Sequence, residues 1–249
     1  IGAQRSGTTS LFHCLAKHPA LRASFKREVH FFDGGLNPGV DTYSEGPRWY
    51  RAHFPRRPAG GGLMAFECSP SYLANPLVPR RMAELIPAVR LIALMRNPVD
   101  RAVSHYFHNR RKGTPDPLPI DEAMRREEER LDDVLRRGDY KSEIFHRYSY
   151  KYRGLYRDRL HGFLEHFPRQ QLLLLNSEKF FDDPQTALRR AFEFLGVDPG
   201  RRINDLKPRN VGGGERDIVA PAALDYLRGF FRPHNRVLYE LAGEDYDWE

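Results

Sequence analysis

Apolar residues in this chain fall into short continuous runs and longer amphipathic stretches. The runs have the length and density typical of buried strands. The amphipathic stretches repeat apolar residues at steps of three and four, which predicts helices. Pro87 and Gly196 provide stop signals for two of these helices, and Pro233 predicts an interruption in the last. The predicted strands span 63–67, 89–95 and 172–175, and the predicted helices span 77–86, 152–167, 183–195 and 222–241.

Strands that alternate with helices predict an α/β fold, with a P-loop-type central parallel sheet and helices on both faces. The 249 residues are expected to form a single domain, 1–249. Ile1 stands directly before a loop motif, so the N-terminal part of the first strand is expected to be missing from the sequence. Ligands of such sheets bind at the carboxyl ends of the strands.

The charge of the chain is basic, with 40 Lys and Arg against 33 Asp and Glu, a net +7. This balance suits an anionic partner. However, the basic residues are interspersed with acids, as in 125–130, which is typical of a solvated helix face. We therefore expect no nucleic-acid partner. No apolar run approaches the roughly 20 residues of a membrane span, so no stable membrane insertion is expected.

The two cysteines, Cys14 and Cys68, are far apart and lack metal-ligand spacing. They are interpreted as buried free thiols, which indicates a reducing compartment. No acidic cluster with metal-ligand spacing occurs either, so no metal site is predicted.

A glycine-rich loop at residues 2–9, Gly-Ala-Gln-Arg-Ser-Gly-Thr-Thr, precedes an amphipathic helix. Gly2 and Gly7 have the spacing that turns backbone N–H groups toward an anion, and the start of the helix adds positive potential. The nucleoside triphosphatase pattern requires Lys where Thr8 stands. The cation lies inside the loop instead, at Arg5. The loop therefore favours a phosphate or sulfate site that does not bind Mg-ATP, although a Gly/Ser/Thr helix cap that binds no ligand is the alternative.

A second candidate anion site follows the strongest predicted strand, which ends in Arg96-Asn97-Pro98. Pro98 ends the strand, Asp100 can cap the next helix, and Ser104 lies one turn further along. A guanidinium at this strand end matches phosphate in a bidentate manner. The alternative is an arginine that bridges strand and helix through an acid. Two anion sites at two strand ends suggest a nucleoside with phosphates at both ends.

These motifs together resemble the paired cofactor motifs of the sulfotransferase superfamily. The pattern is similar to the heparan sulfate glucosamine 3-O-sulfotransferases and their bacterial relatives. The resemblance is carried by Gly-x-x-Arg-Ser-Gly-Thr-Thr-Ser-Leu, by Arg96-Asn-Pro-x-x-Arg-x-x-Ser, and by segments 28–33, 67–72, 155–168 and 246–248.

The resemblance implies an enzyme that moves a sulfuryl group from 3′-phosphoadenosine 5′-phosphosulfate (PAPS) to a hydroxyl, leaving 3′,5′-adenosine bisphosphate. It implies Glu28 as the catalytic base, with His30 orienting the acceptor or sharing the base role. A surface glutamate and a core histidine are the alternatives. Arg5 would stabilise the leaving oxygen. The implied cofactor-binding residues are Arg5, Ser6, Gly7, Thr8, Thr9, Ser10, Arg96, Ser104, Arg209 and Gly213, and Tyr156 is expected at the cofactor pocket or in the core.

Three features depart from the family pattern. Many members carry Lys where Arg5 stands, and Arg remains charged, so it can act only electrostatically. The glucosaminyl enzymes carry Lys where Cys68 stands, which argues against a heparan-like acceptor. Their C-terminal cysteine pair is also absent, which favours a cytoplasmic, bacterial relative.

The acceptor is a glycan or small-molecule hydroxyl that the sequence does not specify. Residues 34–49 and 109–119 are expected to line its entrance, where Tyr43, Trp49 and Phe107 could stack on a ring or pack in the core. Two other functions stay open: a P-loop kinase acting on a small molecule, and a non-catalytic anion-binding module.

Overall fold

The computed structural model describes residues 1–56, 62–204 and 215–248. Its strands form two parallel pairs, in which Leu21 pairs with Met64 and Leu91 with Leu172. Residues 1–3 lie extended along the second pair: the Ile1 amino group donates to the Ile92 carbonyl (2.9 Å), and Gly2 forms a parallel bridge with Ala93. The strands are β1 (Leu21–Ala23), β2 (Met64–Phe66), β3 (Leu91–Met95) and β4 (Leu172–Asn176).

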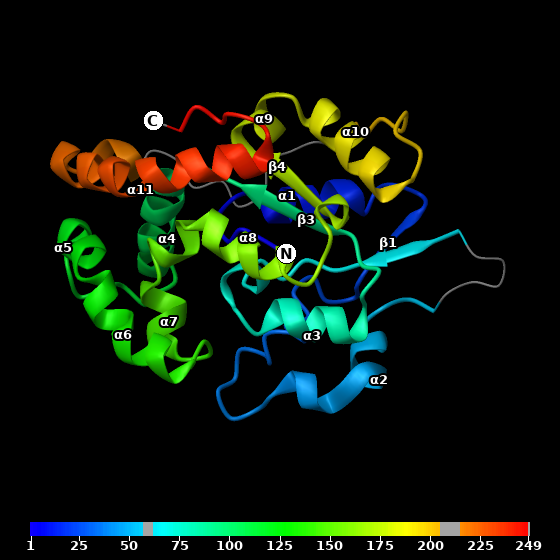
Figure 1. Cartoon of the computed structure of the whole chain (residues 1–249), viewed down its shortest axis with the longest axis horizontal. Helices are drawn as coiled ribbons and strands as arrows, with labels where there is room; N and C mark the ends of the chain where they lie inside the picture. The colour runs from blue at the N-terminus through cyan, green and yellow to red at the C-terminus, as the bar shows by residue number, and fades with distance from the viewer. Residues whose placement is uncertain (57–61, 205–214, 249) are drawn as a thin grey trace.

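The helices connect and flank these strands (Figure 1). They are α1 (Thr8–Leu15), α2 (Gly46–Arg51), α3 (Val78–Leu85), α4 (Pro98–Arg111), α5 (Ile120–Arg125), α6 (Glu127–Arg137), α7 (Glu143–Tyr148), α8 (Tyr156–Leu164), α9 (Ser177–Asp182), α10 (Pro184–Leu195) and α11 (Pro221–Ala242). Short 3₁₀ turns are η1 (Thr42–Glu45), η2 (Tyr72–Ala74), η3 (Tyr152–Gly154), η4 (Arg169–Gln171) and η5 (Glu215–Ile218). None of the described helices is both long and apolar enough to cross a bilayer.

Alternate residues of β3 face two different hydrophobic cores. Leu91, Ala93 and Met95 pack with α3 and α8, whereas Leu94 packs with α1 and α10. This alternation follows from the pleat of a strand. Figure 1 shows these helices on opposite sides of the strands. The predicted α/β class, with parallel strands covered on both faces, is confirmed.

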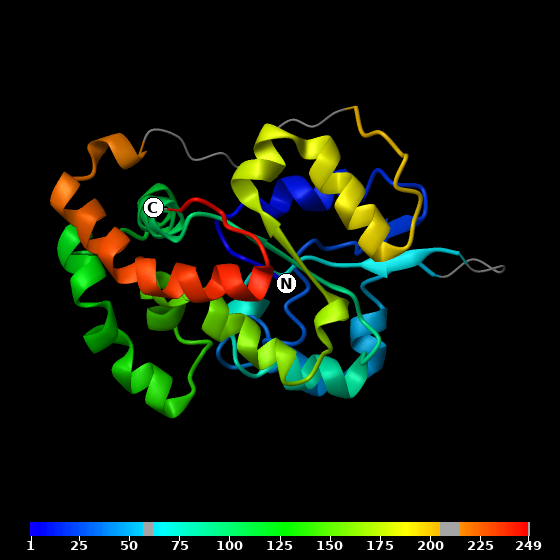
Figure 2. The same ribbon diagram turned by 45° about the horizontal axis from the view of Figure 1, so that its top comes forward.

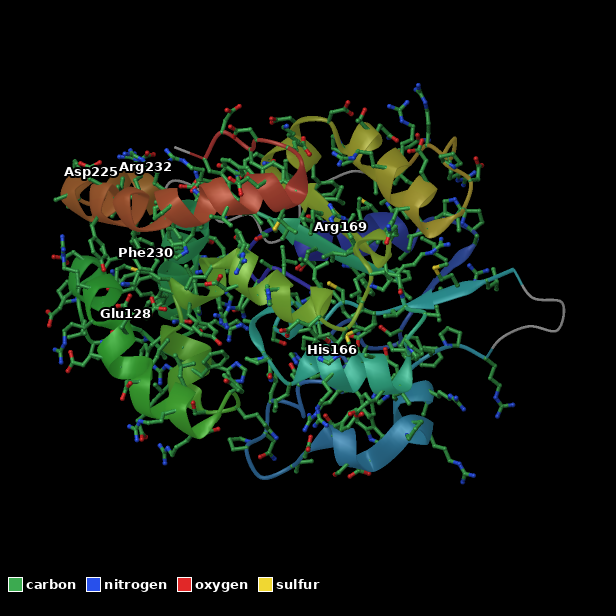
Figure 3. All side chains as sticks on the ribbon, viewed as in Figure 1. Glu128, His166, Arg169, Asp225, Phe230 and Arg232 are labelled. Atoms are coloured by element: carbon green, nitrogen blue, oxygen red, sulfur yellow. The ribbon has the colours of Figure 1, made fainter. Side chains whose placement is uncertain are left out.

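A second, helical region built from α4 to α7 and the first half of α11 lies beside the strands (Figure 2). Lys151 is buried there, within 2.6 Å of Glu128 and over the ring of Phe230 at 4.6 Å (both labelled in Figure 3). The segment 125–130 is solvent-accessible as expected, with the exception of Glu127. The helix breaks at Arg126, and Glu127 is buried, where it accepts the N–H groups of residues 151 and 152.

Helix ends agree with most of the predictions. Asp183 caps α10 by accepting the N–H of Thr186, and Gly196 ends it in the left-handed conformation. Two predictions of helix continuity were wrong. The helix expected over 152–167 is divided into η3 and α8, because Leu155 between them has non-helical backbone angles (φ −78°, ψ +64°).

The second error concerns Pro233, which does not interrupt α11. Phe231 packs into the core of the helical region and Leu238 into the core of α3 and α8. Apolar packing on both sides of the proline therefore holds one continuous helix, despite the lost backbone hydrogen bond.

Candidate active site

A polar cleft of about 940 Å³ opens where the loop before α1 meets the carboxyl end of β3. This is the edge at which parallel sheets bind ligands. Its lining is rich in charged residues: Gln4, Arg5, Ser6, Gly7, Thr8, Thr9, Arg27, Glu28, Pro70, Arg96, Asp100, His108, Arg111, Lys112, Ser177, Glu178, Phe181 and Asp182.

The loop before α1 requires glycine at position 7. Gly7 has φ +85°, and a Cβ there would lie 2.6 Å from the ring of Phe181. The helix begins at Thr8 without a side-chain cap. Because the first N–H groups of a helix have no partner within it, this turn offers donors and a positive dipole to an anion.

The two predicted anion motifs meet in space. The Arg5 Nε and Nη2 atoms each lie 3.3 Å from the Ser104 hydroxyl, which is 99 residues away in the sequence. The Arg96 Nη1 atom lies 3.4 Å from the Arg5 carbonyl oxygen. Tyr156, which is buried, donates to the Arg96 carbonyl at 2.8 Å. Tyr156 therefore supports the turn that carries Arg96.

The turn after β3 is held by two side chains. Asn97 caps α4 by accepting the N–H of Val99 at 3.0 Å. The Asn97 N–H in turn donates to Glu178 of α9 at 2.9 Å. The sequence had suggested Asp100 as the cap, and this was wrong, since Asn97 occupies the position directly before the first helical residue.

The segment after β1 places three ionisable groups in a row. His30 is buried between two carboxylates, with Nδ1 2.8 Å from Asp33 Oδ2 and Nε2 3.2 Å from Glu28 Oε2. The Ser71 hydroxyl donates to Asp33 at 2.7 Å. Glu28 also pairs with Arg27 and faces the cleft.

The electrostatics of this row keep all three groups charged. Burial alone would lower the pKa of His30, but hydrogen bonds to Asp33 and Glu28 raise it to about 9. Burial alone would raise the pKa of Glu28, yet His30 and Arg27 hold it below its usual value. The same reasoning applies to Asp33, where burial is outweighed mainly by His30. An ionised Glu28 can accept a proton, while a protonated His30 has no free lone pair.

The structure brings most of the predicted site residues together. Arg5, Ser6, Gly7, Thr8, Thr9, Glu28 and Arg96 line the cleft. Ser10 is buried in α1, and His30 and Ser104 are buried just behind the lining, in contact with Glu28 and Arg5. Arg209 and Gly213 lie outside the described residues.

Sequence reasoning missed several residues of the lining. His108 lies one helical turn beyond Ser104 in α4, so helical spacing from Ser104 could have identified it. Glu178 and Phe181 of α9 carried no such signal, because only the tertiary fold brings α9 to the loop before α1.

The expected acceptor entrance is placed only in part. Of residues 109–119, Arg111 and Lys112 line the cleft, whereas the described lining contains none of residues 34–49. Tyr43 and Trp49 instead pack on Phe31, with ring centroids 5.2 and 5.9 Å apart. Their aromatic rings therefore pack against the core and do not line this cleft.

Comparison with known proteins identifies the family of this chain. Residues 1–207 match the family model described as "Sulfotransferase domain". The chain belongs to the sulfotransferase family. Heparan sulfate glucosamine 3-O-sulfotransferase 6 of Mus musculus is 31% identical over 270 residues, covering 100% of this chain and 72% of that protein.

Two further similarities define the relationship. Heparan sulfate glucosamine 3-O-sulfotransferase 3B1 of Mus musculus is 30% identical over all of this chain, which spans 64% of that sulfotransferase's length. The crystal structure of a sulfotransferase from Alicyclobacillus acidocaldarius superposes with a TM-score of 0.79, at 28% identity, over 100% of this chain and 96% of that one. The predicted family and fold are confirmed.

Proposed function

We propose that this chain transfers a sulfuryl group from PAPS to a hydroxyl of a carbohydrate or another small molecule. One observation carries the proposal. Arg5, Ser104 and Arg96, from two motifs far apart in the sequence, meet within 3.4 Å at the edge of one cleft that also contains Glu28. Membership in the sulfotransferase family supports the same reaction class.

The residues of the cleft fit a bisphosphorylated nucleoside. Two guanidinium groups, two threonine hydroxyls and an uncapped helix start are donors suited to phosphate and sulfate oxygens. A side chain at position 7 would clash with the Phe181 ring, because a Cβ there would lie 2.6 Å from it. Glycine at this position therefore lets the loop turn beside the cleft. Residues 5–10 would hold the 5′-phosphosulfate, and Arg96 with Ser104 would hold the 3′-phosphate.

Bound PAPS supplies the sulfuryl group together with a phosphate that can depart. The roles of the protein are positioning, proton transfer and charge stabilisation. Glu28 accepts the proton of the acceptor hydroxyl. Arg5 offsets the negative charge that develops at the phosphate oxygen, and it does so without giving up a proton.

The geometry supports Glu28 over His30 as the base. Both ring nitrogens of His30 face carboxylates, at 2.8 and 3.2 Å, and its pKa of about 9 keeps it protonated at neutral pH. His30 then orients the Glu28 carboxylate. Glu28 itself is ionised and reaches the cleft.

The acceptor class is inferred from the relatives and from the cleft. The relatives are heparan sulfate enzymes by name, so a carbohydrate hydroxyl is the first class to test. Cys68, which stands where the glucosaminyl enzymes carry Lys, lies at the wall of a separate, mostly apolar cavity. Hydroxyls of other small molecules are therefore included in the proposal.

Binding and turnover test the proposal separately. We expect calorimetry to show binding of 3′,5′-adenosine bisphosphate in the presence of EDTA, and no comparable binding of ATP with Mg²⁺. Radiolabelled PAPS is then incubated with a panel of carbohydrate and small-molecule acceptors. Glu28→Ala should keep the nucleotide affinity within about 2-fold and lose about 10²- to 10⁴-fold in turnover.

Two results would contradict this reading. Preference for ATP with Mg²⁺ would favour a kinase. Binding of acidic glycans that persists in Glu28→Ala, without transfer of label by the unmodified protein, would favour a non-catalytic module.

A further inference from the structure

The base segment, residues 27–32, is held by the segment that follows β2. The Cys68 N–H donates to the Arg27 carbonyl at 3.1 Å. Further along, the His30 N–H donates to the Ser69 hydroxyl at 3.1 Å, and the N–H of residue 31 donates to the Tyr72 hydroxyl at 2.9 Å. Two consecutive backbone N–H groups of the base segment therefore donate to side-chain hydroxyls.

Both hydroxyls point at one carboxylate, that of Glu67. Ser69 donates to Glu67 Oε2 at 2.6 Å, and Tyr72 donates to Glu67 Oε1 at 2.7 Å. The N–H groups of His30 and residue 31 thus each donate to a hydroxyl that donates in turn to Glu67.

This arrangement requires a hydrogen-bond acceptor at position 67. A hydroxyl has one proton, and once that proton goes to Glu67 the oxygen is oriented to accept a backbone N–H. A carboxylate can receive both hydroxyl protons, because each of its oxygens carries lone pairs. Burial raises the pKa of Glu67, and the hydrogen bonds from Ser69 and Tyr72 act in the opposite direction.

We propose that Glu67 is a positioning residue, one that orients Glu28 and His30 by ordering the hydroxyls of Ser69 and Tyr72. The proposal rests on the proposed function, in which Glu28 is the base. His30 has φ +54°, a value that a residue with a side chain rarely adopts unless its surroundings impose it. The Glu67 network imposes this backbone, and the backbone places the ring between Glu28 and Asp33.

The substitution Glu67→Gln tests the role with almost no change in shape. Its amide nitrogen donates, so one hydroxyl loses the acceptor for its proton and turns away from the backbone. Displacement of a catalytic group by about 1 Å can cost 10²-fold. We expect turnover to fall about 10- to 100-fold, with nucleotide affinity within about 2-fold of the unmodified protein. The pKa of the His30 ring, followed by NMR, should fall from about 9 toward 6.5.

Glu127→Gln is the matched control. Like Glu67, Glu127 is a carboxylate that accepts two short hydrogen bonds, here from the backbone N–H groups of residues 151 and 152, but it is buried in the helical region. The Glu127→Gln variant should lose about as much stability as Glu67→Gln, while its turnover and its His30 titration stay unchanged. This comparison separates positioning from a general loss of stability.

The outcomes are distinct. Wild-type turnover and an unchanged His30 titration in Glu67→Gln would overturn the positioning role. If that variant does not fold, Tyr72→Phe removes one of the two hydroxyls without changing the ring, and an unchanged His30 titration there would overturn the role equally. Normal turnover by Glu28→Ala would instead overturn the proposed base, while the titration would still report the hold of Glu67 on His30.

Discussion

The candidate site has two halves, which differ in how closely hydrogen bonds within the chain hold them. The base side comprises Glu28, His30 and Asp33, and the donor side comprises Arg5, Arg96 and Ser104. On the base side, Asp33 lies 2.8 Å from His30 and 2.7 Å from Ser71. On the donor side, Arg5 contacts the Ser104 hydroxyl at 3.3 Å and Arg96 contacts a carbonyl at 3.4 Å. The first distances are those of strong hydrogen bonds, whereas the second approach the limit for a hydrogen bond.

The two halves therefore differ in how far their geometry depends on a ligand. The base side is assembled from charges and donors within the protein, so it is oriented before any acceptor arrives. The donor side presents guanidinium groups to neutral oxygens, a contact that an anionic phosphate improves. We therefore expect the base side to respond to pH and the donor side to respond to nucleotide.

The largest expected effect concerns the stability of the base side between pH 6.5 and 9. His30 has a folded pKa of about 9 against 6.5 unfolded, so it binds its proton more tightly when folded. Its contribution is fully present below pH 6.5 and is lost as pH rises toward 9, and it amounts to about 3 kcal/mol. Urea unfolding across this range should show the decline, and Asp33→Asn should reduce it.

The difference between the stability curves of the unmodified protein and Asp33→Asn isolates the contribution of His30. Burial raises the pKa of Glu127 to about 7, but Glu127 titrates in both proteins and cancels. Parallel stability curves for the unmodified protein and Asp33→Asn would show that the base side is not held by the His30 charge.

The next effect concerns nucleotide binding on the donor side. Arg96→Ala should weaken binding of 3′,5′-adenosine bisphosphate about 10- to 100-fold, since a hydrogen bond to a charged group contributes about 1.5–3 kcal/mol. Arg90→Ala is the control, because Arg90 precedes β3 and donates to the Phe194 carbonyl at 2.9 Å. Calorimetry should leave the Arg90 variant unchanged. Equal losses in both variants would mean that net charge, and not position, governs binding.

The smallest effect concerns the helix cap beside Arg96. Asn97→Ala removes the cap of α4 and should cost about 0.5–2 kcal/mol of stability. Because α4 carries Ser104, nucleotide affinity should also fall, by about 3-fold. Ser142→Ala removes the comparable cap of α7 and should cost stability alone. An unchanged nucleotide affinity in Asn97→Ala would separate the cap from the donor site.

Local sequence patterns were sufficient for much of this protein. Apolar runs located β2, β3 and β4, and stop residues such as Gly196 located helix ends, because these depend on neighbours in the chain. The two motifs around Arg5 and Arg96 predicted an anion site at strand ends. The structure places both motifs at one cleft, while their roles remain proposals.

The surroundings of these motifs depend on contacts between segments that are distant in the sequence. Glu178 reaches Asn97 across 81 residues, Tyr72 reaches the base segment across 41, and Tyr156 reaches Arg96 across 60. Glu67 carries no pattern that distinguishes a supporting carboxylate from any other acid after a strand. Periodicity reports which face of an element is buried, but the partner of a buried polar group depends on how distant elements pack.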